Sequence, residues 1–410
     1  MSGPAAPAAL SSRLRVLAYT SLGHFINDGT SLFVPVVAAL LATGHGMNTV
    51  ALAILFLVYY AASSLLSPYV GRLADVGGHP ARLLAAGLVL LGAGLSVFYL
   101  ALTFPSAALG LSLSAGFLTG FGSAFYHPLG ATLLQQSFGP AERGKALGIN
   151  GAVGSTGRAL YPVIFFLIGL AVSSSDSLVV FALFAVAGGM VVLSVSREAG
   201  GHAARRSEGP LSLRSTVTRG IALLAVVAFV RSTASQGIIA WMPTYLSYHP
   251  ILGGSLNLGL EVAILYVAGI LGQPIFGVLV DRFDRRGLLA LSSVGTALST
   301  VGFLLTGGAL PVLFLLLIGF FTFSAFPMLM SLTPDYLPSG ASTLANSIVF
   351  GLGTGIGGAL GPFLVGLLAY GGYSHIPFAL EVMAALGIFA AATVVILPRP
   401  GRGGRLPLFG

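Results

Sequence analysis

The sequence predicts an all-α integral membrane protein, with twelve transmembrane helices in two pseudo-symmetric six-helix halves around a central cavity. Three observations predict it: the composition, the placement of the basic residues and an internal repeat. Of the 410 residues, 56% are hydrophobic and only 7% are charged. A chain with so few charges cannot cover its apolar side chains in a water-soluble fold of ordinary proportions, so we expect it to lie in lipid.

Apolar stretches long enough to cross a membrane follow one another along the chain. Each span needs roughly 20 residues to cross about 30 Å of hydrocarbon. In the first half we expect spans at 15–42, 49–70, 82–103, 107–137, 146–172 and 177–196. In the second half we expect them at 219–246, 259–280, 288–306, 311–333, 342–370 and 376–397. The first stretch resembles a signal peptide but continues to Leu41 without a small-residue cleavage pattern, so we expect a retained helix.

Basic residues gather in alternate connections between these spans. Seventeen of the nineteen Lys and Arg residues fall in segments that would share one side of the membrane, and only Arg158 and Arg231 do not. Cytoplasmic loops collect basic residues, which predicts a multi-pass cell-membrane protein with both termini in the cytoplasm. The net charge of +8 is spread over these loops, so it favours contact with lipid headgroups and not with nucleic acid.

An internal repeat divides the chain. Residues 67–75 recur as 273–281, and 120–128 and 157–162 have counterparts at 319–327 and 357–362, each offset by about 200 residues. We therefore expect an N-terminal half at 1–196, a cytoplasmic linker at 197–218, a C-terminal half at 219–397 and a cytoplasmic tail at 398–410. Four prolines repeated between the halves are expected to bend their helices: Pro128, Pro162, Pro327 and Pro362.

The Pro-x-x-Gly-x-Leu-x-Asp pattern after the second span, repeated after the eighth, resembles the signature loop of the major facilitator superfamily. Residues 21–28, 122–128 and 148–162 are similar to the fosmidomycin-resistance group of exporters within it. The first copy of the loop departs from the fuller signature at 77–82. The resemblance implies a conformational latch at the membrane edge, formed by Gly71, Asp75, Gly277, Asp281 and Arg282.

Asp28 is an acid about halfway along the first span, where an ionised carboxylate must face a cavity or a partner. His24 and Asn27 share its helix face. We expect a proton-coupling site of Asp28, His24 and His127, with Tyr126 beside it. The alternative is a polar cluster that only holds the first helix to its neighbours.

Arg158 and Arg231 are the two basic residues within spans. Either could form a permanent ion pair with Asp28, or bind an anionic substrate such as a phosphate, phosphonate or carboxylate. The resemblance implies a basic residue near Arg231 but none at Arg158. The remaining candidates for the substrate path are Asn27, Tyr126, Gln236 and Asn346, whereas Trp241 is predicted to be an interfacial anchor.

These features favour a secondary active transporter that exports a small organic anion or drug in exchange for protons. Proton-coupled uptake of an organic anion is the alternative, and a membrane-embedded enzyme or receptor is less well supported. The sequence has no catalytic constellation and no phosphate-binding loop for ATP, so we expect neither an enzyme nor a cofactor. Without cysteine or a His-x-x-His pattern, a metal site lacks ligands. We expect the protein to function as a monomer.

Overall fold

A computed structural model of the protein describes residues 10–77, 79–138, 140–198, 217–252, 257–280, 282–337, 345–346 and 348–399. Most of the predicted linker and tail, the latch residue Asp281 and the side chain of Asp75 lie outside these residues. The predicted domain boundaries therefore stay predictions.

The first part of the chain forms seven α-helices. They are α1 (Leu10–Ser31), α2 (Phe33–His45), α3 (Thr49–Gly77), α4 (Pro80–Thr103), α5 (Ala108–Ser137), α6 (Pro140–Ala171) and α7 (Ser174–Glu198), with a 3-10 turn, η1 (Pro105–Ala107), before α5. The helices α5 and α6 continue past Pro128 and Pro162 without interruption.

The second part is more broken. Its α-helices are α9 (Arg219–Tyr248), α10 (Asn257–Leu279), α11 (Arg285–Leu305), α12 (Leu310–Phe323), α13 (Ala325–Asp335), α15 (Gly357–Leu368) and α16 (Ile376–Thr393). A π-helix, η2 (Ile348–Ile356), leads into α15, and two 3-10 turns, η3 (Tyr373–His375) and η4 (Val394–Ile396), flank α16.

Within the described ranges, eleven helices are long and apolar enough to cross a membrane. In this count α1 and α2 form one continuous stretch, Ser11–His45. The expected span 311–333 is occupied by α12 and α13, which are separated at Ser324, and α12 alone falls short of a crossing. The protein is therefore a multi-pass membrane protein, and the tenth predicted span, 311–333, is a broken helix.

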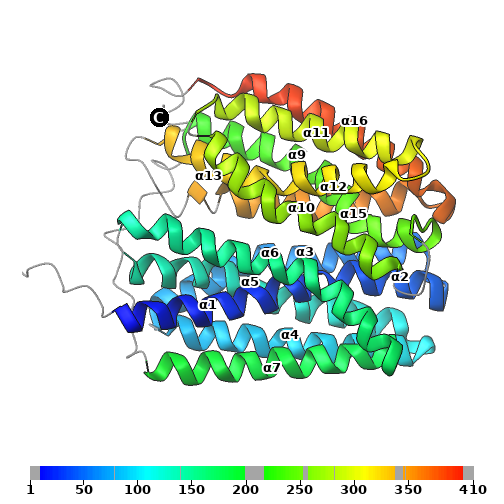
Figure 1. Ribbon diagram of the computed structural model, residues 1–410, viewed down its shortest axis with the longest axis horizontal. Helices are drawn as coiled ribbons and strands as arrows, with labels where there is room; N and C mark the ends of the chain where they lie inside the picture. The colour runs from blue at the N-terminus through cyan, green and yellow to red at the C-terminus, as the bar shows by residue number, and fades with distance from the viewer. Residues whose placement is uncertain are drawn as a thin grey trace, which may run out of the picture.

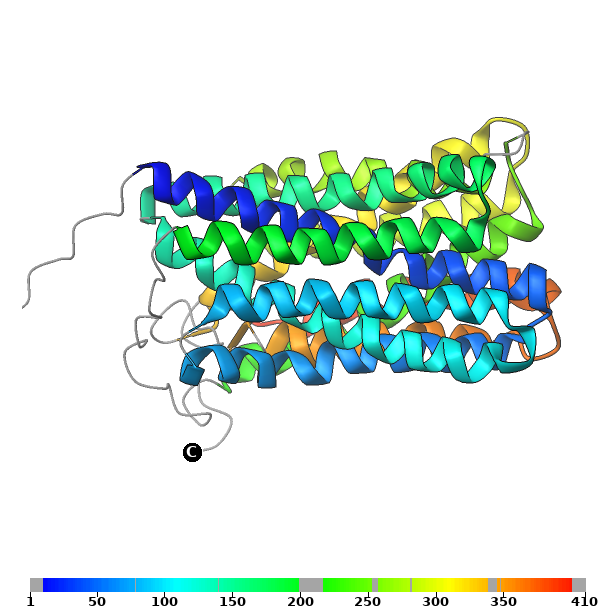
Figure 2. The same ribbon diagram turned by 90° about the horizontal axis from the view of Figure 1, so that it is seen from below.

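The helices run along one common direction, and those before and after the linker lie side by side as two groups (Figures 1 and 2). Between the groups, α6 contacts α10, α3 contacts α15 and η2, and α2 contacts α9. The other extensive helix contacts are within α1 to α7 or within α9 to α16.

The buried apolar side chains form a shared core at one end of the bundle and two separate cores at the other. The shared core contains side chains of both groups, such as Phe56 from α3 and Val365 from α15. The separate cores lie around Leu88 in the first group and Leu289 in the second. The two groups are thus joined at the end predicted to be extracellular.

Hydrogen bonds across the groups lie at this joined end. The Thr49 hydroxyl donates to the carbonyl of Ala369 at 3.0 Å, and the Tyr373 hydroxyl donates to the carbonyl of Met47. Glycines allow close helix crossings here and elsewhere: a Cβ on Gly319 would collide with the carbonyl of Leu265.

Trp241 corrects a prediction. Its position near a helix end suggested an interfacial anchor, but the side chain is fully buried. The indole Nε1 donates to the carbonyl of Pro362 at 2.8 Å, and the ring packs edge-on against Phe56 of α3. Trp241 lies in the seam between the two helix groups, where α9 packs against α3 and α15. The expectation was wrong because the sequence does not show which helices cover this position.

Candidate functional site

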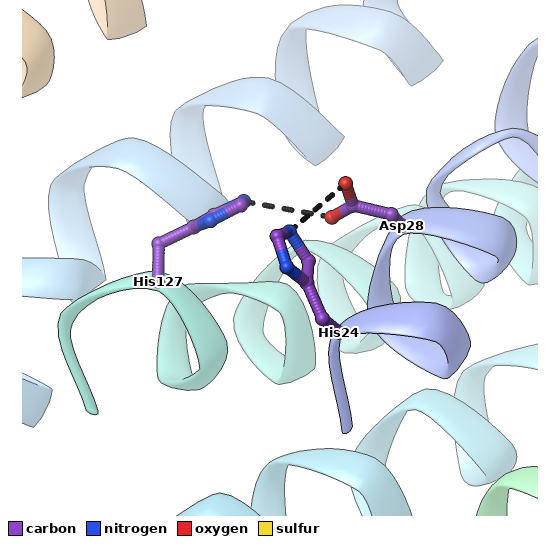
Figure 3. A group of neighbouring side chains, drawn as sticks. All are labelled: His24, Asp28 and His127. Atoms are coloured by element: carbon purple, nitrogen blue, oxygen red, sulfur yellow. Dashed lines mark ion pairs between the residues drawn. The ribbon is translucent and has the colours of Figure 1, made fainter. Parts of the chain in front are cut away.

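Asp28 lies in α1 with its side chain only 3% exposed, and three cationic or titratable groups surround it. His24 is one turn earlier on the same helix, and its Nε2 is 3.2 Å from Asp28 Oδ2. His127 of α5 places its Nε2 3.8 Å from Asp28 Oδ1 (Figure 3). The Asn27 side-chain amide donates to the same Oδ1 at 3.0 Å. The structure thus brings together the residues that the sequence grouped as a proton site.

The surroundings of His24 fix where its protons lie. Its Nδ1 is 2.9 Å from the backbone carbonyl oxygen of Asn150, which can only accept a hydrogen bond. Nδ1 therefore carries a proton. The other ring nitrogen, Nε2, then faces Asp28 Oδ2 at 3.2 Å, and the two form an ion pair whenever His24 is protonated. The contact between His24 and Asp28 thus places an imidazole nitrogen and a buried carboxylate oxygen within ion-pair distance.

Arg158 comes from α6 and completes the surroundings of Asp28. Its Nη1 is 3.3 Å from Asp28 Oδ2, and its Nη2 donates to the Ser155 hydroxyl at 3.2 Å. Of the two alternatives for this arginine, the structure forms the ion pair with Asp28. The guanidinium also lies over the ring of Phe323 from α12, 5.3 Å from its centre. Arg158 therefore touches an acid in the first helix group and an aromatic ring in the second.

Tyr126 and Asn150 contact His24 and hold its ring in place. The ring of Tyr126 stacks on that of His24 with 4.4 Å between centres. Its hydroxyl lies 2.8 Å from the side-chain oxygen of Asn150 and 3.1 Å from the carbonyl of Thr20. Tyr126 was predicted to line the substrate path, whereas here it is buried among α1, α5 and α6. Asn150 was missed, because an uncharged residue in a Gly-rich stretch gives no signal of its own.

The donor atoms of His24, Asp28 and His127 all lie within 4.8 Å of one another. The sequence analysis grouped these three residues as a proton site but did not count them as metal ligands, because it looked for cysteines and a His-x-x-His pattern. A single cation could be held there as far as distances go. However, Arg158 already places a positive charge 3.3 Å from Asp28 Oδ2, where a metal would have to compete with it.

Arg231 of α9 is 7% exposed and lies in the second helix group. Its Nη2 donates to the backbone carbonyls of Phe321 and Thr322, at 3.2 and 3.0 Å. Among the described residues, no carboxylate lies within ion-pair distance of it, so the alternative of a pair with Asp28 does not form.

The other predicted site residues lie apart from this cluster. Gln236 is half-buried in α9 near Gly358 of α15, and Asn346 is half-buried just before η2. The latch glycines Gly71 and Gly277 have open space around their Cα hydrogens, and Arg282 is exposed.

An ion pair that the sequence analysis missed joins helix ends near the predicted latch. Arg285 Nη1 lies 2.7 Å from Asp335 Oδ2 and also donates to the carbonyl of Ser331. It connects α11 to α13.

Residues 20–352, most of the chain, match the model of the Major Facilitator Superfamily. The chain belongs to this superfamily, whose members are transporters. It is 25% identical over 392 residues to the fosmidomycin resistance protein of Escherichia coli (strain K12), a match that covers 93% of this chain and 92% of the relative. It is also 25% identical to the uncharacterized MFS-type transporter YfnC of Bacillus subtilis (strain 168), covering 92% and 91%.

Solved structures show the same fold. A bacterial homologue of the human lysosomal transporter Spinster, crystallised in an inward-facing and occupied conformation, aligns with a TM-score of 0.75 over 99% of this chain and 100% of that chain. The sequence identity is 13%, so the similarity concerns the fold alone. An unoccupied, inward-facing structure of that homologue aligns with a TM-score of 0.73. The resemblance to the superfamily inferred from the signature loop is confirmed.

Proposed function

We propose that this transporter couples the movement of a small organic anion to that of a proton, with the coupling located at Asp28, His24 and Arg158. One observation carries the proposal: the same buried carboxylate oxygen of Asp28 lies 3.2 Å from Nε2 of His24 and 3.3 Å from Nη1 of Arg158. A proton and a guanidinium therefore compete for one acid. His127, whose side chain is 62% exposed, faces the other oxygen and is a route for protons from water.

The pairing sets the sign of the coupling. An anionic substrate that binds the Arg158 guanidinium draws it away from Asp28. The carboxyl group then loses a positive partner and holds its proton more firmly. By linkage, a bound proton equally favours the bound anion. Anion and proton therefore cross the membrane together, and a proton gradient directed inwards drives uptake.

We therefore place proton-coupled uptake before export in exchange for protons, whereas the sequence analysis placed export first. Export remains the second candidate, because the chain is 25% identical to a fosmidomycin resistance protein, and resistance can result from removal of a compound from the cell. Exchange requires a substrate that expels the proton, for example one that contacts Asp28 directly and leaves Arg158 in place.

Proton counting during ligand binding separates the two candidates. The purified full-length protein, in weakly buffered detergent solution with a pH dye, is mixed with fosmidomycin and with a panel of small phosphonates and carboxylates. We expect a binding ligand, identified by a thermal shift, to cause proton uptake, which Asp28→Asn removes. Proton release on binding would favour exchange. Binding with no proton change at any pH from 5 to 8 would refute coupling at this site.

A further inference from the structure

The helix that spans 310–335 is broken where Arg231 meets it. Helix α12 ends at Phe323 and α13 begins at Ala325. The sequence favours a break here, because Pro327 has no N–H for the carbonyl of Phe323, four residues earlier. The carbonyls of Phe321 and Thr322 lie in the last turn of α12, where the helix itself offers no N–H four residues further on. In a membrane such groups are costly unless another donor reaches them.

Arg231 supplies that donor. One guanidinium nitrogen reaches the carbonyls of both Phe321 and Thr322. Its charge also lies at the negative end of the α12 dipole, which favours a cation. Among the described residues no carboxylate lies near Arg231, so its positive charge is balanced by the carbonyls at the end of α12.

The space beside Arg231 does not suit an anion. Its Nε has no hydrogen-bond partner, and Arg231 lines a cavity of about 10 Å³ together with Ser235, Ser293 and Thr296. The hydroxyls of Ser293 and Thr296 already donate to the carbonyls of Leu289 and Ser292. These two hydroxyls have therefore used their protons and can only accept a further hydrogen bond, which an anion cannot donate. A volume of this size holds about one water molecule, which can accept from Nε and donate to a hydroxyl.

The residue that follows these two carbonyls contacts the proposed coupling site. Phe323, the last residue of α12, lies under the Arg158 guanidinium that pairs with Asp28. We propose that Arg231 is a positioning residue, which fixes the broken end of α12 and thereby keeps the Phe323 ring against Arg158. The first half of this statement stands on the local geometry, and the second rests on the function proposed above.

Hydrogen exchange tests the first half without a substrate. The full-length protein in lipid nanodiscs is compared as wild type, Arg231→Gln and Arg231→Lys. Arg82→Gln serves as the control, because it makes the same change at an exposed arginine of α4. We expect the amides of residues 325, 326 and 328 to exchange roughly tenfold faster in Arg231→Gln, as a charge-assisted contact is lost. Arg231→Lys, which keeps the charge with fewer donors, should fall between, and it serves alone if Arg231→Gln does not fold. Unchanged or slower exchange would overturn the proposal.

A pH profile tests the second half. The apparent melting temperature is measured from pH 4 to 9 for the wild type, Asp28→Asn, Phe323→Leu and Arg231→Gln. We expect a pH-dependent step that Asp28→Asn removes, and Arg231→Gln and Phe323→Leu should move its midpoint in the same direction, with no further shift in the double variant. A uniform loss of stability at every pH in Arg231→Gln would overturn the link to Arg158. Absence of the step in the wild type would instead refute coupling at Asp28, and the exchange measurement would still decide the role of Arg231 at the break.

Discussion

Two arginines lie inside the bundle, one in each helix group, and they meet opposite kinds of partner. Arg158 is paired with the carboxylate of Asp28, a side chain that can take a proton and release the arginine. Arg231 is bound to backbone carbonyls, which do not titrate. An arginine inside a membrane protein can therefore be released from its partner when that partner changes charge, as a carboxylate does on protonation. An arginine bound to backbone carbonyls stays in place, because carbonyls do not change charge.

The first helix group also differs from the second in how its site is built. Around Asp28, side chains from three helices hold one another, as Tyr126 and Asn150 do for His24. Around Arg231, the partners are the main chain of one broken helix. We therefore expect changes in the first region to alter coupling and affinity, and changes in the second to alter the placement of α12 and α13.

The largest effect is expected for Asp28→Asn. The amide keeps the size of the side chain but cannot take the proton, so acid-driven net uptake should fall to background while exchange of substrate across the membrane continues. Flux of a ligand found by thermal shift is measured in proteoliposomes with and without a pH gradient. Asp176→Asn, at the exposed start of α7, is the control and should transport normally. Normal acid-driven flux in Asp28→Asn would show that Asp28 is not the coupling residue, so the two regions would not differ in this respect.

Arg158→Gln should come next. It removes the contact proposed for the anion, worth about 1.5–3 kcal/mol for a hydrogen bond to a charged group, so affinity for an anionic ligand should fall roughly tenfold to a hundredfold. A neutral analogue should bind as before. Titration calorimetry on both ligands measures this. If only Arg231→Gln lowered the affinity for the anion, Arg231 and not Arg158 would be the arginine that binds the substrate.

Arg158→Gln also removes one of the cations that pair with the buried carboxylate of Asp28. Because an unpaired buried carboxylate is destabilising, the apparent melting temperature of Arg158→Gln should fall, and adding Asp28→Asn should recover part of it. Arg231→Gln should recover less from Asp28→Asn, because Arg231 makes no described ion pair with Asp28 and reaches that site only through Phe323 and Arg158. Equal rescue of both variants would show that Arg231 acts on Asp28 as directly as Arg158 does.

The smallest effect is expected for Tyr126→Phe. It keeps the ring stacked on His24 but removes the hydroxyl near Asn150 and Thr20, a loss of about 0.5–1.5 kcal/mol. The melting temperature should fall by a few degrees, and transport should be retained. The matched change Tyr99→Phe, in α4 away from the cluster, should have no effect on stability. A loss of transport in Tyr126→Phe would place this hydroxyl in the substrate path, as the sequence first suggested.

The sequence was sufficient for what depends on hydropathy, charge and one-turn spacing. The membrane spans follow from apolar length, and the face shared by His24, Asn27 and Asp28 follows from helical periodicity. It was insufficient wherever the partner lies on another helix. The contact of Arg158 with Phe323, the carbonyls that bind Arg231 and the carbonyl of Asn150 all depend on which helices pack together and in what register.

The burial of Trp241 makes it an intrinsic optical probe of the transport cycle. It is the only tryptophan in the chain, and its indole lies in the seam that joins the two helix groups at the predicted extracellular end. When that seam opens, water reaches the ring, so its fluorescence should shift to longer wavelengths. The unmodified protein therefore reports its own opening, and stopped-flow emission can time that step without an attached dye.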